Sequence, residues 1–382
     1  MENRSRRQVM QLAAAGALLG AAGARGAPAA RAQSAAGAIV DANMHWLPEN
    51  VFTDERLLSA FVESVPREYG IRAKIAPVPG KSLRQIIIEQ PAGYEVLNYA
   101  ENQYSAAGQI ADMDQAKIDR AILRMPCWQE WLGLEACKKV NDGLAQHMRR
   151  YPGRFQALAV APPWGSKEAI KEVERCIGDL GFCGVQMAAH YGNLYLDEDE
   201  FKPYFKFLDG LGVPVVVHHT PMPVDYGSIV KYANLRRQFG RCIAQGTAVG
   251  RELFSNMFEE FPNLRLIHSM LGGGFFAFAD MLAPPSTGKD AVDRFEDQTA
   301  RIRRYLKENV FFDLSGAPQW GTAQLECAVK VLGADHILYG GSYPIRRDWF
   351  QQGVSYVRSL AISEADKALI LGGNANRLFK LA

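Results

Sequence analysis

Residues 38–45 read Ala-Ile-Val-Asp-Ala-Asn-Met-His, and this stretch gives the first indication of the fold. A short apolar run is followed by polar side chains at the point where a buried strand would end. Similar runs recur along the chain, and helical stretches of about ten to fifteen residues separate most of them. Short, continuous apolar runs are typical of strands that are buried on both faces. The pattern therefore predicts parallel β-α units.

Eight such runs occur before the C-terminal segment. Eight β-α units that close on themselves form a (β/α)8 barrel, and this α/β architecture is the fold that we predict. The predicted strands are residues 38–40, 118–123, 155–162, 184–187, 213–217, 264–267, 310–314 and 336–339.

The segment between the first and second predicted strands, residues 51–108, is too long to be a simple loop. Residues 73–88 within it have the pattern of a small hairpin. Active sites of this barrel form at the C-terminal ends of the strands, so an insertion after the first strand would cover the site. We predict that residues 51–108 form a lid within a single barrel domain, residues 33–382.

The start of the chain is typical of an export signal. Arg6 and Arg7 precede a short apolar stretch, 12–22, and residues 30–32 read Ala-Arg-Ala, which fits a cleavage site. The alternative is a plain membrane anchor, but the stretch is short and rich in Ala and Gly. We predict a twin-arginine signal over residues 1–32, the twin-arginine export machinery as a partner, and a periplasmic or secreted location.

The composition excludes some classes of function. The chain has 382 residues, 48% of them hydrophobic, and a net charge of +2. No basic run is interleaved with aromatic residues, so no nucleic-acid partner is expected. We expect a small-molecule substrate instead. The six cysteines include no Cys-x-x-Cys pair. We expect most of them to be buried and to behave as small apolar side chains. The alternative that one or two disulfides form is not excluded by the sequence.

Histidines gather at the predicted strand ends. Five of the seven lie at or just after such an end, where this barrel carries its active site. Histidine transfers protons near neutral pH, so these positions indicate acid-base chemistry. The predicted catalytic residues are His45, His190, His218 and His219; the fifth histidine is His268.

Other side chains at the same ends are candidates for substrate binding. Arginine holds a carboxylate or phenolate through its forked donors, and Asn or Ser donates to an oxygen that gains negative charge. A tryptophan would line an aromatic pocket. The predicted substrate-binding residues are Asn43, Trp46, Arg124, Ser342, Tyr343 and Arg346.

Several short blocks, each weak alone, occur together in order. Residues 113–121 read MDQAKIDRA, 151–155 read YPGRF, 340–344 read GGSYP and 373–379 read GNANRLF. Together they resemble the amidohydrolase-related family, in the branch typified by aminocarboxymuconate-semialdehyde decarboxylase. The resemblance covers nearly all of the predicted mature chain. It implies a barrel enzyme, a hydrolase or lyase, that acts on small acids or lactones.

The resemblance also implies a metal site. Members of that family typically hold one divalent ion with a His-x-His pair after the first strand, histidines after the fifth and sixth strands, and an aspartate after the eighth. Position by position, His45 and His218 are retained. Asn43, Met270 and Ser342 replace the other three ligands. Zinc needs three or four strong donors, so we predict a degraded site with no metal and no cofactor.

These points combine into a functional expectation. We expect metal-independent acid-base chemistry on a small unsaturated or aromatic carboxylate or lactone: lactone hydrolysis, decarboxylation, isomerisation or elimination. Two alternatives stay open. One is a metal-dependent amidohydrolase or decarboxylase with an atypical set of ligands, and the other is an inactive exported barrel that binds a ligand or supports a partner. Barrels of this family often dimerise, so a homodimer also stays open.

Overall fold

The computed structural model of the chain describes residues 37–47, 49–67, 70–284 and 299–381. The predicted export signal, residues 1–32, lies outside the described residues. No helix within these described ranges is long and apolar enough to cross a membrane. All six cysteines fall within the described ranges, and all are free thiols, so the disulfides that the sequence left open are not formed.

A central sheet of eight parallel strands organises the described chain. In spatial order its members are β1 (Val40–His45), β5 (Arg120–Arg124), β6 (Phe155–Ala159), β7 (Gly184–Ala188), β10 (Val215–His218), β11 (Leu266–His268), β12 (Val310–Asp313) and β13 (Ile337–Leu338). Backbone hydrogen bonds also join β1 to the segment after β13. The amide of His45 donates to the carbonyl of Tyr343 at 2.9 Å, and the amide of Ser342 donates to that of Asn43 at 2.9 Å. These bonds close the sheet into a ring, so the predicted (β/α)8 barrel is confirmed.

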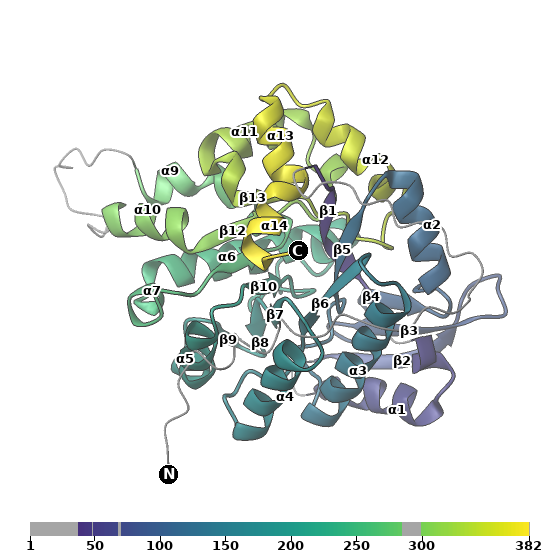
Figure 1. Ribbon diagram of the computed structural model, residues 1–382. Coiled ribbons are helices and arrows are strands. Elements are labelled where there is room, and N and C mark those ends of the chain that lie inside the picture. The colour runs from purple at the N-terminus through teal and green to yellow at the C-terminus, as the bar shows by residue number, and fades with distance from the viewer. Residues whose placement is uncertain (1–36, 48, 68–69, 285–298, 382) are drawn as a thin grey trace, which may run out of the picture. The chain divides into compact units, whose positions relative to one another are not determined.

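Helices cover the outside of the ring, as Figure 1 shows. Each buries one face because its apolar residues recur at helical spacing. In α4, for example, Ala169, Val173 and Cys176 are buried. The longer helices are α2 (Ala106–Ala116), α3 (Leu134–Arg150), α4 (Lys167–Gly178), α5 (Lys202–Leu211), α6 (Gly240–Phe254), α10 (Thr299–Glu308), α11 (Thr322–Leu332) and α12 (Arg347–Arg358).

The interior of the ring has two layers of different chemistry. The lower layer is apolar, and α14 (Asn374–Phe379), which lies across the middle of the ring in Figure 1, packs Phe379 against it. Side chains alternate along a strand, so the next interior position lies two residues further on. Ile122 is thus followed by Arg124, and Phe311 by Asp313. The second layer is polar and buried, and it lies just beneath the C-terminal ends of the strands.

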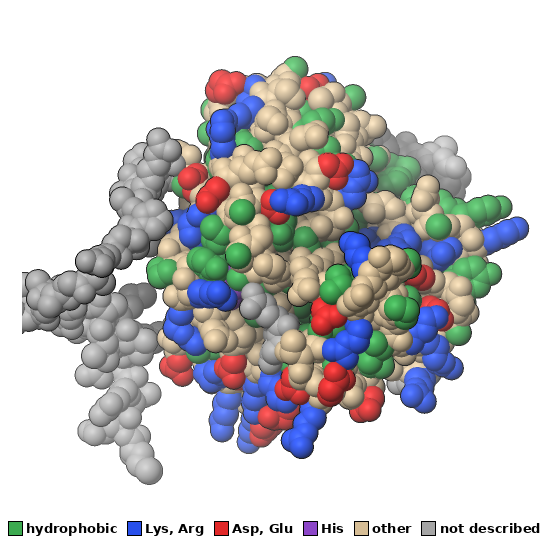
Figure 2. Space-filling model, turned by 90° about the vertical axis from the view of Figure 1, so that its right-hand side faces the viewer, with side chains coloured by type: hydrophobic (Ala, Val, Ile, Leu, Met, Phe, Trp, Pro, Cys, Tyr) green, Lys and Arg blue, Asp and Glu red, His purple; other side chains and the backbone are tan. Residues whose placement is uncertain are grey.

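The predicted insertion forms structure of its own. It contains α1 (Glu55–Glu63) and an antiparallel sheet of β2 (Arg72–Pro77), β3 (Arg84–Glu89) and β4 (Glu95–Ala100). The pairing of β2 with β3 confirms the predicted hairpin. The role of residues 51–108 as a lid stays a prediction. Figure 2 views the side of the molecule that carries these elements, and basic and acidic side chains are interspersed on it, in keeping with the small net charge.

Candidate active site

A cavity of about 370 Å³ opens at the C-terminal ends of the strands. That volume suits a small organic molecule. The strand ends supply His45, His218 and His219 to its wall, and the insertion supplies Tyr99. The cavity therefore lies where a barrel of this kind places its active site.

Three of the four predicted catalytic histidines meet in this cavity. The Nε2 atoms of His45 and His218 are 2.9 Å apart, and their rings meet edge to face. The rings of His218 and His219 lie side by side, with their centroids 4.1 Å apart. The end of β10 and the end of β1 thus bring three imidazoles into one cluster.

The protonation of this cluster follows from its surroundings. Burial lowers the pKa of His45, His218 and His219 well below the ordinary value, and nearby positive charges lower it further. The three rings are therefore neutral at neutral pH, and each has one nitrogen with a free lone pair. The Nδ1 atom of His218 lies 2.9 Å from the carbonyl oxygen of His219. Nδ1 therefore carries the proton, which leaves the lone pair of Nε2 facing His45.

The fourth predicted histidine, His190, lines a different cavity. Its Nε2 and Nδ1 atoms lie 2.7 Å and 2.9 Å from the carbonyl oxygens of Met222 and Gly192. His268 also lies apart, because it points out of the ring toward α6. Its Nε2 is 2.8 Å from a carboxylate oxygen of Glu252. The structure does not bring these two histidines to the cluster.

Two predicted substrate-binding residues, Asn43 and Arg124, lie beneath the cavity in the polar layer. Arg124 is fully buried, and its Nη2 is 2.9 Å from Asp313 Oδ2. Its Nε donates to Asn43 Oδ1 at 2.6 Å, and its Nη1 donates to Ser269 Oγ at 3.2 Å. Asn43 Nδ2 donates in turn to Asp313 Oδ1 at 3.0 Å. Arg124 thus donates its hydrogen bonds to other side chains inside the barrel, and it does not line the cavity.

Ser342 and Arg346 line the cavity at its rim. Ser342 has a positive φ of 53°, and its hydroxyl lies 3.4 Å from Asn43 Nδ2. Arg346 pairs with Asp348 at 2.6 Å, and its guanidinium lies 4.2 Å from the ring centroid of Trp349. Two of the six predicted substrate-binding residues are therefore placed at the cavity.

Tyr343 and Trp46 pack away from the cavity. The ring of Tyr343 lies against Phe350, with centroids 5.0 Å apart. The indole of Trp46 lies against His147, also at 5.0 Å. Both are buried among apolar side chains.

Arg241, which the sequence analysis missed, lines the cavity from the first turn of α6. Its buried Nε has no hydrogen-bond partner, and its Nη2 donates to the carbonyl of Val96 at 3.3 Å. It forms no ion pair with any carboxylate of the described residues, whereas Arg237 pairs with Glu95 at 2.6 Å. Burial lowers the pKa of Arg241, yet a guanidinium remains charged in a protein. A partly buried cation without a counter-charge favours a nearby anion, so Arg241 indicates a position for one.

The same cavity can be tested for a metal ion. The Nε2 atoms of His45 and His218 converge, and both rings are neutral, as metal-binding imidazoles must be. The contact of His218 Nδ1 with a backbone carbonyl is the kind of support that orients a metal ligand. The side-chain oxygen of Asn43 is not available as a metal ligand, because it accepts a hydrogen bond from Arg124. These residues fit an ion that takes two imidazoles and fills its remaining positions with other oxygens.

A second possible set of metal ligands lies on the other side of His218. The ligand atoms of Cys127, His218 and His219 lie within 4.8 Å of one another. Burial raises the pKa of the Cys127 thiol, and the set would require His218 to give up its Nδ1 hydrogen bond. The pair of Nε2 atoms is therefore the better candidate.

Residues 40–381 match the family profile described as Amidohydrolase. The chain is 30% identical to gamma-resorcylate decarboxylase of Rhizobium sp. over 262 residues, which cover 65% of this chain and 77% of the relative. Two solved structures share the fold. The dihydroxybenzoic acid decarboxylase of Polaromonas sp. is 22% identical, with a TM-score of 0.65 over 90% of this chain and 97% of that one. The 5-carboxyvanillate decarboxylase of Novosphingobium aromaticivorans is 22% identical, with a TM-score of 0.68 over 90% and 96%.

These structures correct one prediction. Both decarboxylases were crystallised with bound manganese, together with 2-nitroresorcinol in one and 4-hydroxy-3-methoxy-5-nitrobenzoic acid in the other. The prediction that the site needs no cofactor, and with it the metal-independent chemistry, is wrong in this light. Three of the five ligand positions are changed in the sequence, and the prediction rested on that loss. The physical reason for the correction is that His45 and His218 direct their Nε2 atoms at one point, which depends on side-chain direction and leaves no signal in the sequence.

The predicted enzyme class stands, because the named relatives are decarboxylases and therefore lyases. The resemblance to the branch of aromatic-acid and aminocarboxymuconate-semialdehyde decarboxylases is likewise confirmed. The fold, the position of the histidine cluster and the match over almost the whole described chain agree: the chain belongs to the amidohydrolase family.

Proposed function

We propose that this protein is a metal-assisted decarboxylase of small hydroxylated aromatic carboxylates. The observation that carries the proposal is the guanidinium of Arg241 beside a cluster of neutral histidines: it is partly buried, forms no ion pair among the described residues, and its Nε has no hydrogen-bond partner. A carboxylate is the planar anion that best matches the forked donors of arginine. The relatives are decarboxylases of gamma-resorcylate and 5-carboxyvanillate, and this supports the reaction class.

The lining of the cavity supports an aromatic anion. Three arginines, Arg237, Arg241 and Arg346, reach it, and no acidic side chain does so among the described residues. Tyr99 and Trp349 supply aromatic surface to the same wall. A flat ring that carries a negative charge would therefore be attracted and would bury its faces.

His45 and His218 are the residues that would hold the ion. A bound divalent ion would polarise the oxygens of the substrate and stabilise the charge that develops as the carboxyl group leaves. Arg241 would meanwhile orient the carboxylate toward the histidines. The ring of His45 is kept neutral by burial, so it does not repel the ion.

Decarboxylation also needs a proton at the ring carbon that loses carbon dioxide. His219 lies in the cavity, and its Nδ1 has no hydrogen-bond partner. Its lowered pKa makes its protonated form a ready donor. We assign His219 to accept the phenolic proton and to return it to the ring carbon as the carbon–carbon bond breaks. The products are carbon dioxide and the phenolate, which takes a proton from water to become the phenol.

The test is turnover by purified protein with its metal content measured. Protein loaded with manganese should convert 2,6-dihydroxybenzoate or a related hydroxybenzoate to carbon dioxide and the phenol in equal amounts. A chelator should abolish turnover, and added manganese should restore it. No turnover of any hydroxybenzoate by the manganese-loaded protein would contradict the proposal. Full turnover by metal-free protein would overturn the assignment of His45 and His218 to the ion.

We further propose, from the sequence alone, that the enzyme is exported by the twin-arginine route and works outside the cytoplasm. Replacement of Arg6 and Arg7 by lysine should retain the protein in the cytoplasm, as fractionation of cells would show. An unchanged distribution would contradict this proposal.

A further inference from the structure

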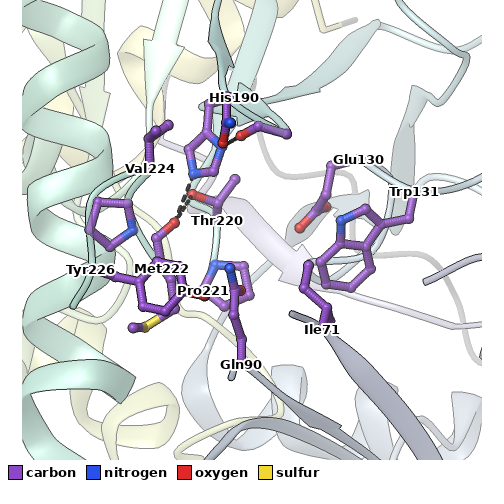
Figure 3. Close-up of a pocket in the computed structure, with 13 residues that line it drawn as sticks. Ile71, Gln90, Glu130, Trp131, His190, Thr220, Pro221, Met222, Val224 and Tyr226 are labelled. Atoms are coloured by element: carbon purple, nitrogen blue, oxygen red, sulfur yellow. Dashed lines mark hydrogen bonds between the residues drawn. The ribbon is translucent and has the colours of Figure 1, made fainter. Parts of the chain in front are cut away.

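A second cavity, of about 220 Å³, lies beside the active site. The loop after β10 divides the two, because His218 and His219 face the first cavity and residues 220–224 line the second. Ile71 and Gln90 complete its wall from the insertion. Figure 3 shows these side chains around an open centre. The described active-site chemistry makes no use of this space.

Glu130 is the unexplained feature of this second cavity. Both carboxyl oxygens are buried, and neither has a hydrogen-bond partner. The backbone amides of Trp128 and Glu130 itself lie near enough to favour the ionised form, yet neither makes a hydrogen bond to the carboxyl group. In Figure 3 the carboxyl group points into the cavity. A buried carboxyl group that lacks partners is costly, so its retention calls for a ligand.

The surroundings supply no cation from the described residues. His190, which lines the same cavity, directs both ring nitrogens at backbone carbonyl oxygens, and burial lowers its pKa. Burial raises the pKa of Glu130 to about 8. The carboxyl group is therefore mostly protonated at neutral pH while the cavity lacks a positive charge.

The rest of the wall suits a hydrocarbon group. Ile71, Pro221 and Met222 are apolar, and Trp131 lies beside the carboxyl group of Glu130 in Figure 3. An aromatic face next to a carboxylate attracts an ammonium group and packs well against its carbon atoms.

We propose that this second cavity binds a small organic amine, whose ammonium group pairs with Glu130 and whose hydrocarbon body packs against Trp131 and Ile71. The two cavities then have opposite preferences. The arginines of the first repel an amine, and the second has no Lys or Arg among the described residues of its lining to pair with a carboxylate. The site is independent of the proposed decarboxylation, and its test does not require turnover.

Benzylamine is the probe, and benzyl alcohol and benzoate are its neutral and anionic counterparts. Binding to the full chain is measured by calorimetry and by NMR at pH 7. Benzylamine should bind more tightly than either counterpart. Glu130→Gln should weaken it at least tenfold, because the variant keeps the shape and removes the charge. Glu135→Gln removes an exposed charge that pairs with Lys138 and should leave the affinity unchanged.

A second measurement uses the wild-type protein alone. The amine selects ionised Glu130, so its affinity should rise about tenfold per pH unit from pH 6 to pH 8. Burial raises the pKa of the other nearby acids, Cys127, Tyr99 and Tyr191, so they stay neutral in this range. Burial lowers the pKa of His190 below its ordinary value, so its charge changes at a lower pH than that of Glu130.

Either of two results would overturn the proposal. One is equal affinity of the wild type and Glu130→Gln for benzylamine. The other is wild-type protein that fails to bind benzylamine or binds it with no dependence on pH. Removal of an unpaired buried acid should not lower the melting temperature of Glu130→Gln. If that variant does not fold, the pH series on the wild type decides the question.

Discussion

Two arginines of this barrel, the fully buried Arg124 and the partly buried Arg241, differ in their partners. Arg124 lies in the polar layer, where Asp313, Asn43 and Ser269 receive its donors. Arg241 lies in the cavity above, and its Nε has no partner. The same side chain is thus satisfied within the protein at one position and left unsatisfied at the other.

This difference in hydrogen-bond partners distinguishes residues that stabilise the barrel from residues that are available to bind a ligand. A fully partnered buried ion pair depends on each member, since removal of one member strands the other. A cation without an ion-pair partner lowers the stability of the ligand-free protein. Binding of an anion then offsets this unfavourable free energy. Four substitutions test the comparison, from the largest expected effect to the smallest.

Arg124→Met should cost the most stability. It leaves the carboxylate of Asp313 buried without its cation, and loss of one member of a buried pair typically costs about 3–5 kcal/mol. Denaturant unfolding measures the change. The matched control is Arg346→Gln, whose exposed pair with Asp348 should contribute little to stability. Equal losses in the two variants would contradict the distinction.

Asp41 is an intermediate case, since one oxygen is satisfied and the other is not. Its Oδ1 accepts from the amides of Asn43 and Gly341, each at 2.8 Å, while its Oδ2 has no partner. Burial raises the pKa of Asp41 from 3.8 to about 6. The folded protein thus binds this proton more tightly than the unfolded chain. The stabilisation that it gives is complete below about pH 4 and is lost as the pH rises through about 6.

The shift corresponds to roughly 3 kcal/mol. Asp41→Asn cannot titrate, so between pH 4 and pH 7 it should gain up to that amount of stability relative to the wild type. Urea unfolding of both proteins across this range measures the difference. Curves that stay parallel would show that Asp41 does not titrate as proposed.

Arg241→Met should affect binding and leave folding intact. Loss of a charged hydrogen bond worth about 1.5–3 kcal/mol should raise KM for a hydroxybenzoate roughly tenfold to a hundredfold. Stability should stay equal or rise, because a partly buried charge that forms no ion pair is removed. Arg241→Lys keeps the charge without the fork and should give an intermediate KM. A large loss of stability with an unchanged KM would place Arg241 in the same class as Arg124.

Ser342→Asp should have the smallest effect, on metal affinity. It puts a carboxylate at the cavity rim, and Asp tolerates the positive φ of 53° at this position. A carboxylate is a harder and stronger ligand for manganese than a hydroxyl. We expect affinity to rise about tenfold, or 1.4 kcal/mol, in a manganese titration. Ser342→Asn is the neutral control, and equal affinity of the two variants would contradict a metal near Ser342.

The periodic parts of the chain could be predicted from the sequence. All eight strands lie at or within a few residues of their apolar runs, because burial on both faces leaves a clear pattern. His45, His218 and His219 were found for a related reason. His45 and His218 end their strands, His219 directly follows one, and the ring brings strand ends together.

The roles of some site residues could not be predicted from the sequence, because they depend on long-range contacts. Arg124 also ends a strand, but Asp313, 189 residues away, pairs with its charge. Arg241 lies in a helix, and only the path of α6 past β4 brings it to the cavity. The run of arginines at 236–241 was its only signal, and such runs are usually exposed. The pairing of Nε2 atoms that supports a metal ion is likewise a matter of side-chain direction.

The most direct measurement combines Arg241 with the carboxylate that it is assigned to hold. Manganese-loaded wild type and Arg241→Met are titrated with 2,6-dihydroxybenzoate and with resorcinol, which lacks the carboxylate. We predict that the substitution weakens binding of the acid at least tenfold and leaves binding of resorcinol unchanged. Equal losses for both ligands, or no loss for either, would contradict Arg241 as the anchor of the substrate carboxylate.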